Sequence, residues 1–189
     1  MTSKYNAVLF DFDGTIADTG RGIFASIQYA VECLGFKPLD NETLRRFIGP
    51  PIYDSFKREL GLDDEKSDFA VKKYREKYAE SGIYELDLYE GIISLIKRLR
   101  ENGIKIGIAS SKPQNFLIRI VDFLEITDLI DFISAPSADD TPQSKASLIS
   151  NASEALNIPK DKILMVGDRY FDINGANGAG VESVGVTFG

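Results

Sequence analysis

The 189-residue sequence predicts an α/β protein whose doubly wound parallel sheet is interrupted by an inserted helical segment. Two observations lead to this prediction. Short apolar runs, bounded by Gly, Asp or Ser, alternate with segments whose apolar residues recur at helical spacing. Between the first two runs the alternation stops for roughly 70 residues, far more than the ~12 residues that a parallel crossover needs.

Five apolar runs are expected to form the strands of the sheet. Most are rich in Val and Ile, and they are nearly continuous rather than alternating, as expected for a parallel sheet that helices cover on both faces. The expected strands are 5–10, 104–109, 131–135, 163–167 and 181–187.

Helices are expected after the second, third and fourth strands and just before the second. In the segment 91–102 the apolar residues lie at helical spacing, and Asn102-Gly103 is a typical C-cap. The helix at 172–179 contains Gly175 and Gly178, each costing up to ~1 kcal/mol relative to Ala, so we expect the C-terminal corner to be the least stable part. The expected helices are 91–102, 113–124, 144–156 and 172–179.

The inserted segment, residues 16–88, is predicted to be a helical cap subdomain without strands. It would join an α/β core formed by residues 1–15 and 89–189, with hinges at 15–19 and 83–90. The expected helices of the cap are 20–34, 41–47, 53–60 and 65–81.

The composition excludes several kinds of enzyme. With no His and a single Cys, the chain cannot build a Ser-His-Asp triad, a His-ligated zinc or haem site, or an internal disulfide. Acid–base chemistry is left to carboxylates, Lys, Tyr or water. Any metal site must be built from oxygen, which favours Mg²⁺, Ca²⁺ or Mn²⁺.

The net charge and the hydropathy of the sequence argue against nucleic-acid and membrane partners. A net charge of -7 argues against nucleic acid, because phosphate backbones need a basic surface. No window approaches the ~18 uninterrupted apolar residues of a membrane span. The apolar run 7–10 near the N-terminus is too short for a signal peptide. We therefore expect a cytoplasmic protein with no nucleic-acid or membrane partner.

Polar side chains follow four of the predicted strands. Each has a plain structural explanation, such as an Asp-Gly turn, a helix N-cap or a surface lysine. A lysine at a helix N-terminus opposes the macrodipole, however, which suggests that its charge has another partner. The candidates are Asp11, Asp13, Ser110, Ser111, Lys145, Asp168 and Asp172.

Together these residues favour phosphoryl chemistry. The carboxyl ends of parallel strands meet at the edge of the sheet where open α/β folds bind ligands. Carboxylates gathered there offer hard oxygen ligands for a divalent cation and one spare nucleophile, while a hydroxyl and an ammonium suit phosphoryl oxygens. The cation is needed because an anionic nucleophile would otherwise repel a phosphate.

The motif set resembles that of the haloacid dehalogenase superfamily. D-x-D-G-T at 11–15, Ser110, Lys145 and G-D-x-x-x-D at 167–172 occur in the order and spacing of that family. The insertion, with Gly-Pro-Pro at 49–51, is similar to the cap of its phosphoglycolate phosphatase-like members. The resemblance implies a Rossmann-type core and a Mg²⁺-dependent phosphatase for a small phosphorylated metabolite, active as a monomer or homodimer.

The resemblance also implies roles for the carboxylates. Asp11 would be the nucleophile and a metal ligand. Asp13 would be the general acid/base and would bind the metal through its backbone carbonyl. Asp168 would ligate Mg²⁺, and Asp172 would support the metal site.

The remaining implied roles concern the substrate. In the cap, Arg45 and Arg46 are candidates to bind a second anionic group, although solvated surface arginines explain them equally well. The transferring phosphoryl group would be held by two side chains and by the backbone of two further residues. These are Ser110 and Lys145, and Phe12 and Ser111.

The sequence departs from the family pattern in two places. Many relatives have Lys-Pro where this chain has Lys145-Ala146, which affects the local loop geometry. Relatives usually continue with another strand and helix beyond the strand at 181–187. Because this sequence stops at Gly189, we expect either a truncated C-terminus or a lost edge strand.

The sequence is compatible with two other functions. A phosphosugar mutase of the β-phosphoglucomutase kind would shield the aspartyl-phosphate from water and return the phosphoryl group to a sugar. A non-catalytic phosphate-binding regulatory module could use the same fold, but it would have little reason to keep mutually repelling carboxylates clustered. A dehalogenase is less favoured, because Asp13 supplies acid–base chemistry that dehalogenation does not use.

Overall fold

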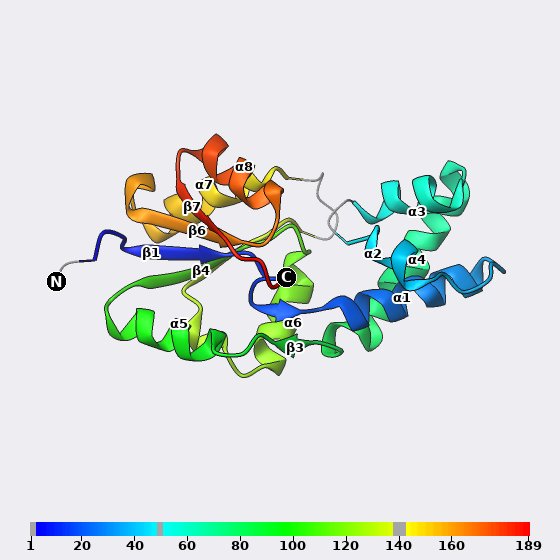
Figure 1. The fold of residues 1–189 in the computed structure, drawn as a ribbon, viewed down its shortest axis with the longest axis horizontal. Coiled ribbons are helices and arrows are strands. Elements are labelled where there is room, and N and C mark those ends of the chain that lie inside the picture. The colour runs from blue at the N-terminus through cyan, green and yellow to red at the C-terminus, as the bar shows by residue number, and fades with distance from the viewer. Residues whose placement is uncertain (1–2, 49–50, 138–142) are drawn as a thin grey trace. The chain divides into compact units, whose positions relative to one another are not determined.

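Two compact units make up the chain in the computed structural model, which describes residues 3–48, 51–137 and 143–189. One unit comprises residues 1–18 and 87–189, and the other comprises residues 19–86. We call them the core unit and the helical unit and describe each by itself (Figure 1). Gly49 and Pro50, part of the Gly-Pro-Pro motif of the sequence analysis, lie outside the described residues.

The core unit contains a five-stranded parallel sheet in the order β5-β4-β1-β6-β7, which confirms the predicted fold class. All four residues of the central strand β1 are buried, as its uninterrupted apolar sequence predicts. The strands are β1 (Ala7–Phe10), β4 (Lys105–Ala109), β5 (Phe132–Ser134), β6 (Ile163–Gly167) and β7 (Glu182–Gly185).

Helices cover both faces of this sheet (Figure 1). On one face lie α5 (Ile92–Glu101) and α6 (Gln114–Phe123), and on the other lie α7 (Lys145–Leu156) and α8 (Tyr170–Ala179). Short 3₁₀ turns, η2 (Thr127–Leu129) and η3 (Lys160–Lys162), precede β5 and β6. The α7 and α8 face encloses an apolar cluster of Ala7, Leu9, Ala109, Ile149, Ala152, Ile163, Met165, Ala176, Ala179 and Val181.

Helix α8 begins two residues earlier than predicted. Arg169 is its N-cap, and the Asp172 carboxylate accepts the backbone N–H of Arg169 at 3.0 Å, forming a capping box. A carboxylate at the third helical position stabilises the first turn in this way. Asp172 therefore lies inside the helix, whereas the sequence pattern predicted it as the first residue.

The predicted absence of strands between residues 16 and 88 was wrong. Two-residue strands β2 (Ala17–Asp18) and β3 (Asp87–Leu88) pair antiparallel where the chain leaves and re-enters the core unit. The backbone N–H of Tyr89 extends this ribbon by donating to the Ile16 carbonyl at 3.1 Å. Strands of two residues are too short to show alternation, so the pattern could not predict them.

The helical unit consists of α1 (Gly20–Cys33), α2 (Asn41–Arg45), α3 (Ile52–Leu60), α4 (Asp64–Glu80) and the 3₁₀ turn η1 (Gly82–Tyr84). Asp40 and Asp63 begin α2 and α4 as N-caps, each accepting a backbone N–H in the first turn. The side chains of Phe47 and Phe56 meet edge to face, with ring centroids 5.1 Å apart. This unit therefore has apolar contacts of its own.

The two glycines of α8 differ in what surrounds them. A Cβ at Gly175 would lie 2.5 Å from Lys145 Cγ and 2.6 Å from Lys145 Cβ, whereas a Cβ at Gly178 would meet the Ala146 Cβ at 3.4 Å. Gly175 is therefore a packing requirement of the α7–α8 contact. Gly178 carries only the helix-propensity cost of glycine.

We expect opposite effects from alanine at these two positions. Gly178→Ala should stabilise the protein by about 0.5–1 kcal/mol through helix propensity. Gly175→Ala should destabilise it by about 1–3 kcal/mol through overpacking against the base of Lys145. Urea denaturation of both variants measures this, each serving as the other's control. Equal stability changes would contradict the packing argument.

Candidate active site

The loop after β1 turns sharply and leaves Asp11 at the carboxyl edge of the sheet. The backbone N–H of Asp11 donates to the Val166 carbonyl at 2.9 Å, so Asp11 continues the ladder with β6. The Phe12 carbonyl then accepts the N–H groups of Ile16 and Ala17 at 2.9 and 3.1 Å, and the Phe12 ring is buried. The hydrogen bonds of this buried turn hold the backbone of Asp11 in place and so determine the position of its carboxylate.

Lys145 contacts the loop after β1, the last residue of β4 and the first turn of α8. Its Nζ lies 2.9 Å from Asp11 Oδ1 and 2.8 Å from Asp172 Oδ1, and it donates to the Ala109 carbonyl at 3.0 Å. The Lys145 side chain is only 8% exposed. These contacts supply the partner that a lysine at the start of α7 lacks within its own helix.

The charges of this cluster shift one another. Burial raises the pKa of Asp11 to about 6, although the Lys145 ammonium opposes the rise and Asp172 and Asp13 add to it. Burial lowers the pKa of Lys145, but Asp11 and Asp172 outweigh it and raise the pKa above the ordinary value for lysine. Lys145 therefore remains an ammonium at neutral pH.

Three carboxylates come close enough to share a cation. Oxygen atoms of Asp11, Asp168 and Asp172 lie within 4.8 Å of one another. Burial raises the pKa of Asp168 as well, opposed by the Arg169 guanidinium, whose Nε lies 3.4 Å from Asp168 Oδ2. A set of buried hard oxygen donors with excess negative charge fits a divalent cation such as Mg²⁺.

Glycines make room for these carboxylates. Gly14 has a φ of +81°, and a Cβ there would lie 2.4 Å from Asp168 Oδ2. A Cβ at Gly167 would lie 2.3 Å from the Asp172 carboxylate. Both glycines are thus required by the close approach of an aspartate side chain, and Gly14 is required by its positive φ as well.

The carboxylate of Asp13 takes no part in this trio. Lys112 Nζ lies 3.0 Å from Asp13 Oδ1, and the Lys112 side chain is 5% exposed. Lys112 directly follows Ser110 and Ser111 in the sequence, but it was not among the predicted site residues. A basic residue between a strand end and a helix-starting proline was the available signal.

The other core candidates occupy the same edge of the sheet. Ser110 is buried at the end of β4, while Ser111 is exposed. The Ser110 hydroxyl is not a helix cap: it accepts the Lys112 backbone N–H at 3.4 Å, and Pro113 is the N-cap of α6. Thr15, the last residue of the D-x-D-G-T motif and one without a predicted role, donates from its hydroxyl to Asp168 Oδ1 at 3.4 Å.

Arg45 and Arg46 lie at the end of α2 in the helical unit. Arg46 is held within that unit by ion pairs to Glu42 at 2.8 Å and Glu59 at 3.4 Å. Arg45 is exposed. Their roles toward a substrate remain predictions, and Arg46 already has carboxylate partners.

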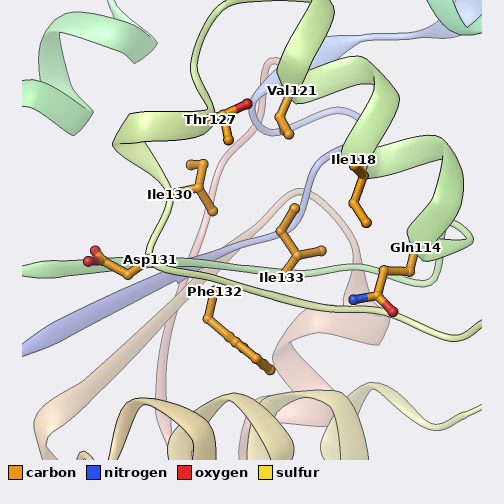
Figure 2. Close-up of a pocket in the computed structure, with 8 residues that line it drawn as sticks. All are labelled: Gln114, Ile118, Val121, Thr127, Ile130, Asp131, Phe132 and Ile133. Atoms are coloured by element: carbon orange, nitrogen blue, oxygen red, sulfur yellow. The ribbon is translucent and has the colours of Figure 1, made fainter.

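A hollow of about 290 Å³ lies elsewhere in the core unit, between α6 and β5 (Figure 2). Its lining is mainly apolar, with Ile118 and Ile133 facing one another in the close-up. Its one carboxylate, Asp131, is paired with Arg100 at 2.7 Å and Lys105 at 2.9 Å. None of the predicted site residues lines this hollow, so it does not mark the chemistry of the sheet edge.

Comparison with known proteins identifies one family. Residues 8–186 match the family described as haloacid dehalogenase-like hydrolase. A 5'-nucleotidase of Pseudomonas aeruginosa is 34% identical over 98% of this chain and 84% of its own length. The tyrosine-protein kinase PtkA of Mycobacterium tuberculosis is 31% identical over 96% of this chain, which spans 62% of the kinase.

A solved structure agrees with these matches. A protein from Clostridium difficile, described as a candidate phosphatase, superposes with a TM-score of 0.91 and 40% sequence identity. The superposition covers 99% of this chain and 87% of the other. Among the described residues, no helix combines the length and hydrophobicity that a membrane span would need.

We expect Lys145→Met to destabilise the metal-free protein by about 3 kcal/mol, because it leaves two buried carboxylates facing one another without their cation. Urea denaturation in EDTA at neutral pH measures the loss. Lys162→Met, which removes an exposed lysine, should change stability by less than about 0.5 kcal/mol. Similar small losses for both variants would show that the ion pairs of Lys145 contribute little.

Proposed function

We propose that this chain, which belongs to the haloacid dehalogenase-like hydrolase family, is a Mg²⁺-dependent phosphatase of small phosphomonoesters that works through an aspartyl-phosphate. The observation that carries the proposal is the buried cluster in which Lys145 bridges Asp11 and Asp172, with Asp168 close by. It combines a carboxylate nucleophile, oxygen ligands and a phosphate-binding cation in one place.

The metal would be held by the carboxylates of Asp11 and Asp168, with Asp172 supporting them directly or through water. When bound, Mg²⁺ would offset the repulsion between these carboxylates and a phosphate dianion and polarise the phosphoryl group. The backbone carbonyl of Asp13 is the further ligand expected from the family resemblance. The acidic cluster suits this role because its cations, Lys145 and Arg169, do not balance all of its carboxylates.

The proposed reaction has two steps. In the first, an oxygen of Asp11 attacks phosphorus, the bond from phosphorus to the ester oxygen breaks, and the Asp13 carboxyl gives its proton to the departing alkoxide. In the second, water attacks the aspartyl-phosphate while Asp13 takes a proton from that water. The products are an alcohol and inorganic phosphate, and both carboxylates return to their starting state.

Lys145 and Ser110 would hold the transferring phosphoryl group. Lys145 is already charged and is oriented by its contacts with Asp11, Asp172 and the Ala109 carbonyl. Such a group needs no reorganisation when negative charge develops on the phosphoryl oxygens. Ser110 directly follows the neighbouring strand β4, and its burial restricts the hydroxyl to the same edge of the sheet.

The two relatives described above are a 5'-nucleotidase and a tyrosine kinase, and both names refer to chemistry on a phosphoryl group. For this chain we propose a small phosphorylated metabolite, phosphoglycolate or another, as substrate. Selectivity would lie in the helical unit acting as a cap. There Arg45 is the better candidate for a second anionic group, since Arg46 is engaged by Glu42 and Glu59.

Asp11→Asn should abolish hydrolysis of p-nitrophenyl phosphate, lowering kcat by at least about 10⁴-fold, because an amide cannot accept the phosphoryl group. The variant should stay folded, since it removes one of several crowded negative charges. Asp161→Asn, at an exposed aspartate before β6, should keep full activity. More than a few per cent of wild-type activity in purified Asp11→Asn would exclude Asp11 as the nucleophile.

Removal of metal should stop the reaction. We expect activity to disappear in EDTA and to return with Mg²⁺, and Ca²⁺ to inhibit because its larger and looser coordination misplaces the nucleophile. Mg²⁺ should also raise the melting temperature of the wild type and have a much smaller effect on Asp168→Asn. Full activity after exhaustive chelation would refute a metal-dependent mechanism.

A further inference from the structure

Each of the two carboxylates of the D-x-D motif has a lysine of its own. Asp11 is paired with Lys145 at 2.9 Å, and Asp13 is paired with Lys112 at 3.0 Å. Sequence proximity placed Asp11 and Asp13 in one cluster, but the structure assigns them to separate ion pairs. Lys145 accounts for the nucleophile, whereas Lys112 is not used by the mechanism above.

The pairing between Lys112 and Asp13 follows from the topology of the sheet. Strands β1 and β4 are parallel neighbours, with Phe10 opposite Ile108, so the loops that leave them run side by side. The Lys112 backbone N–H donates to the Ser110 hydroxyl at 3.4 Å, and Pro113 begins α6 directly afterwards. These constraints fix the base of the Lys112 side chain.

The ion pair between Lys112 and Asp13 is largely shielded from solvent on the lysine side. The Lys112 side chain is 5% exposed and that of Asp13 is 26% exposed. A lysine ammonium is rarely taken out of water without a partner, because its desolvation costs several kcal/mol. Asp13 is the more exposed of the two, as a carboxylate that must meet a substrate needs to be. The geometry suits a buried cation that holds a reachable carboxylate in place.

We propose that Lys112 is a positioning residue for Asp13. Its ammonium holds the Asp13 carboxyl group where the ester oxygen departs, and it takes no part in binding the transferring phosphoryl group. In the first step Asp13 acts in its protonated form: the proton passes to the leaving oxygen as the phosphorus–oxygen bond breaks, and the carboxylate that remains is the partner of Lys112, which neither gains nor loses a proton. This inference rests on the proposed function and deepens it.

A positioning role for Lys112 predicts that the loss of activity in its variants depends on the leaving group. Protonation by a general acid matters most when the leaving group is a poor one, and it contributes typically about 10²–10⁴-fold. p-Nitrophenolate leaves without much help, whereas unsubstituted phenolate is more basic and needs the proton. A residue that acts only through Asp13 should therefore affect phenyl phosphate much more than p-nitrophenyl phosphate.

The test compares Lys112→Met, Asp13→Asn and the double variant with the full-length wild type on these two aryl phosphates, with Mg²⁺ present. For Lys112→Met we expect kcat/KM to fall by about tenfold or more on phenyl phosphate and by less than about threefold on p-nitrophenyl phosphate. In the Asp13→Asn background, Lys112→Met should lower kcat/KM by less than about twofold. Circular dichroism checks the fold, and Lys112→Gln replaces Lys112→Met if the latter does not fold.

The outcomes separate the two proposals. Equal losses on both substrates, or a full additional loss in the Asp13→Asn background, would show that Lys112 acts on the phosphoryl group or on the fold and would overturn the positioning role alone. Unchanged kinetics in Lys112→Met would overturn it as well. A wild type that hydrolyses neither substrate would overturn the proposed function, and the role of Lys112 with it.

Discussion

The ion pairs of Lys145 are the interaction on which the rest of the site depends. One ammonium holds Asp11 after β1 and Asp172 in α8, and it is itself held by the Ala109 carbonyl at the end of β4. The arrangement requires Gly175, because any side chain there would strike the base of Lys145. The order of the strands, the packing of α7 against α8 and the glycine at position 175 thus together determine where the buried Lys145 ammonium lies.

The excess of negative charge at the site determines which ligands it favours. Carboxylates outnumber the cations around Asp11, and burial raises the pKa values of Asp11 and Asp168. Such a cluster favours a divalent cation, which lowers the cost of keeping the carboxylates ionised. In the proposed mechanism Lys145 serves the nucleophile and Lys112 serves the acid, so the two carboxylates of one motif can take different roles.

Sequence patterns predicted the sheet and its helices well, because buried parallel strands and amphipathic helices leave clear periodicity over several residues. The two-residue strands β2 and β3 carry no such signal. Loop geometry was also beyond the sequence: the spacing of Asp11 and Asp13 suggested one cluster, yet Lys112 draws Asp13 into a separate pair. Gly175 looked like a helix weakness because its neighbour, Lys145, lies 30 positions away in sequence.

The most direct test is to find where the phosphoryl group goes. The enzyme would be mixed with p-nitrophenyl phosphate and Mg²⁺, quenched with acid during turnover, digested and examined by peptide mass spectrometry. The account predicts a phosphoryl group on Asp11 that disappears once the substrate is exhausted. A phosphoryl group on another residue, or turnover without any phosphorylated peptide, would contradict it.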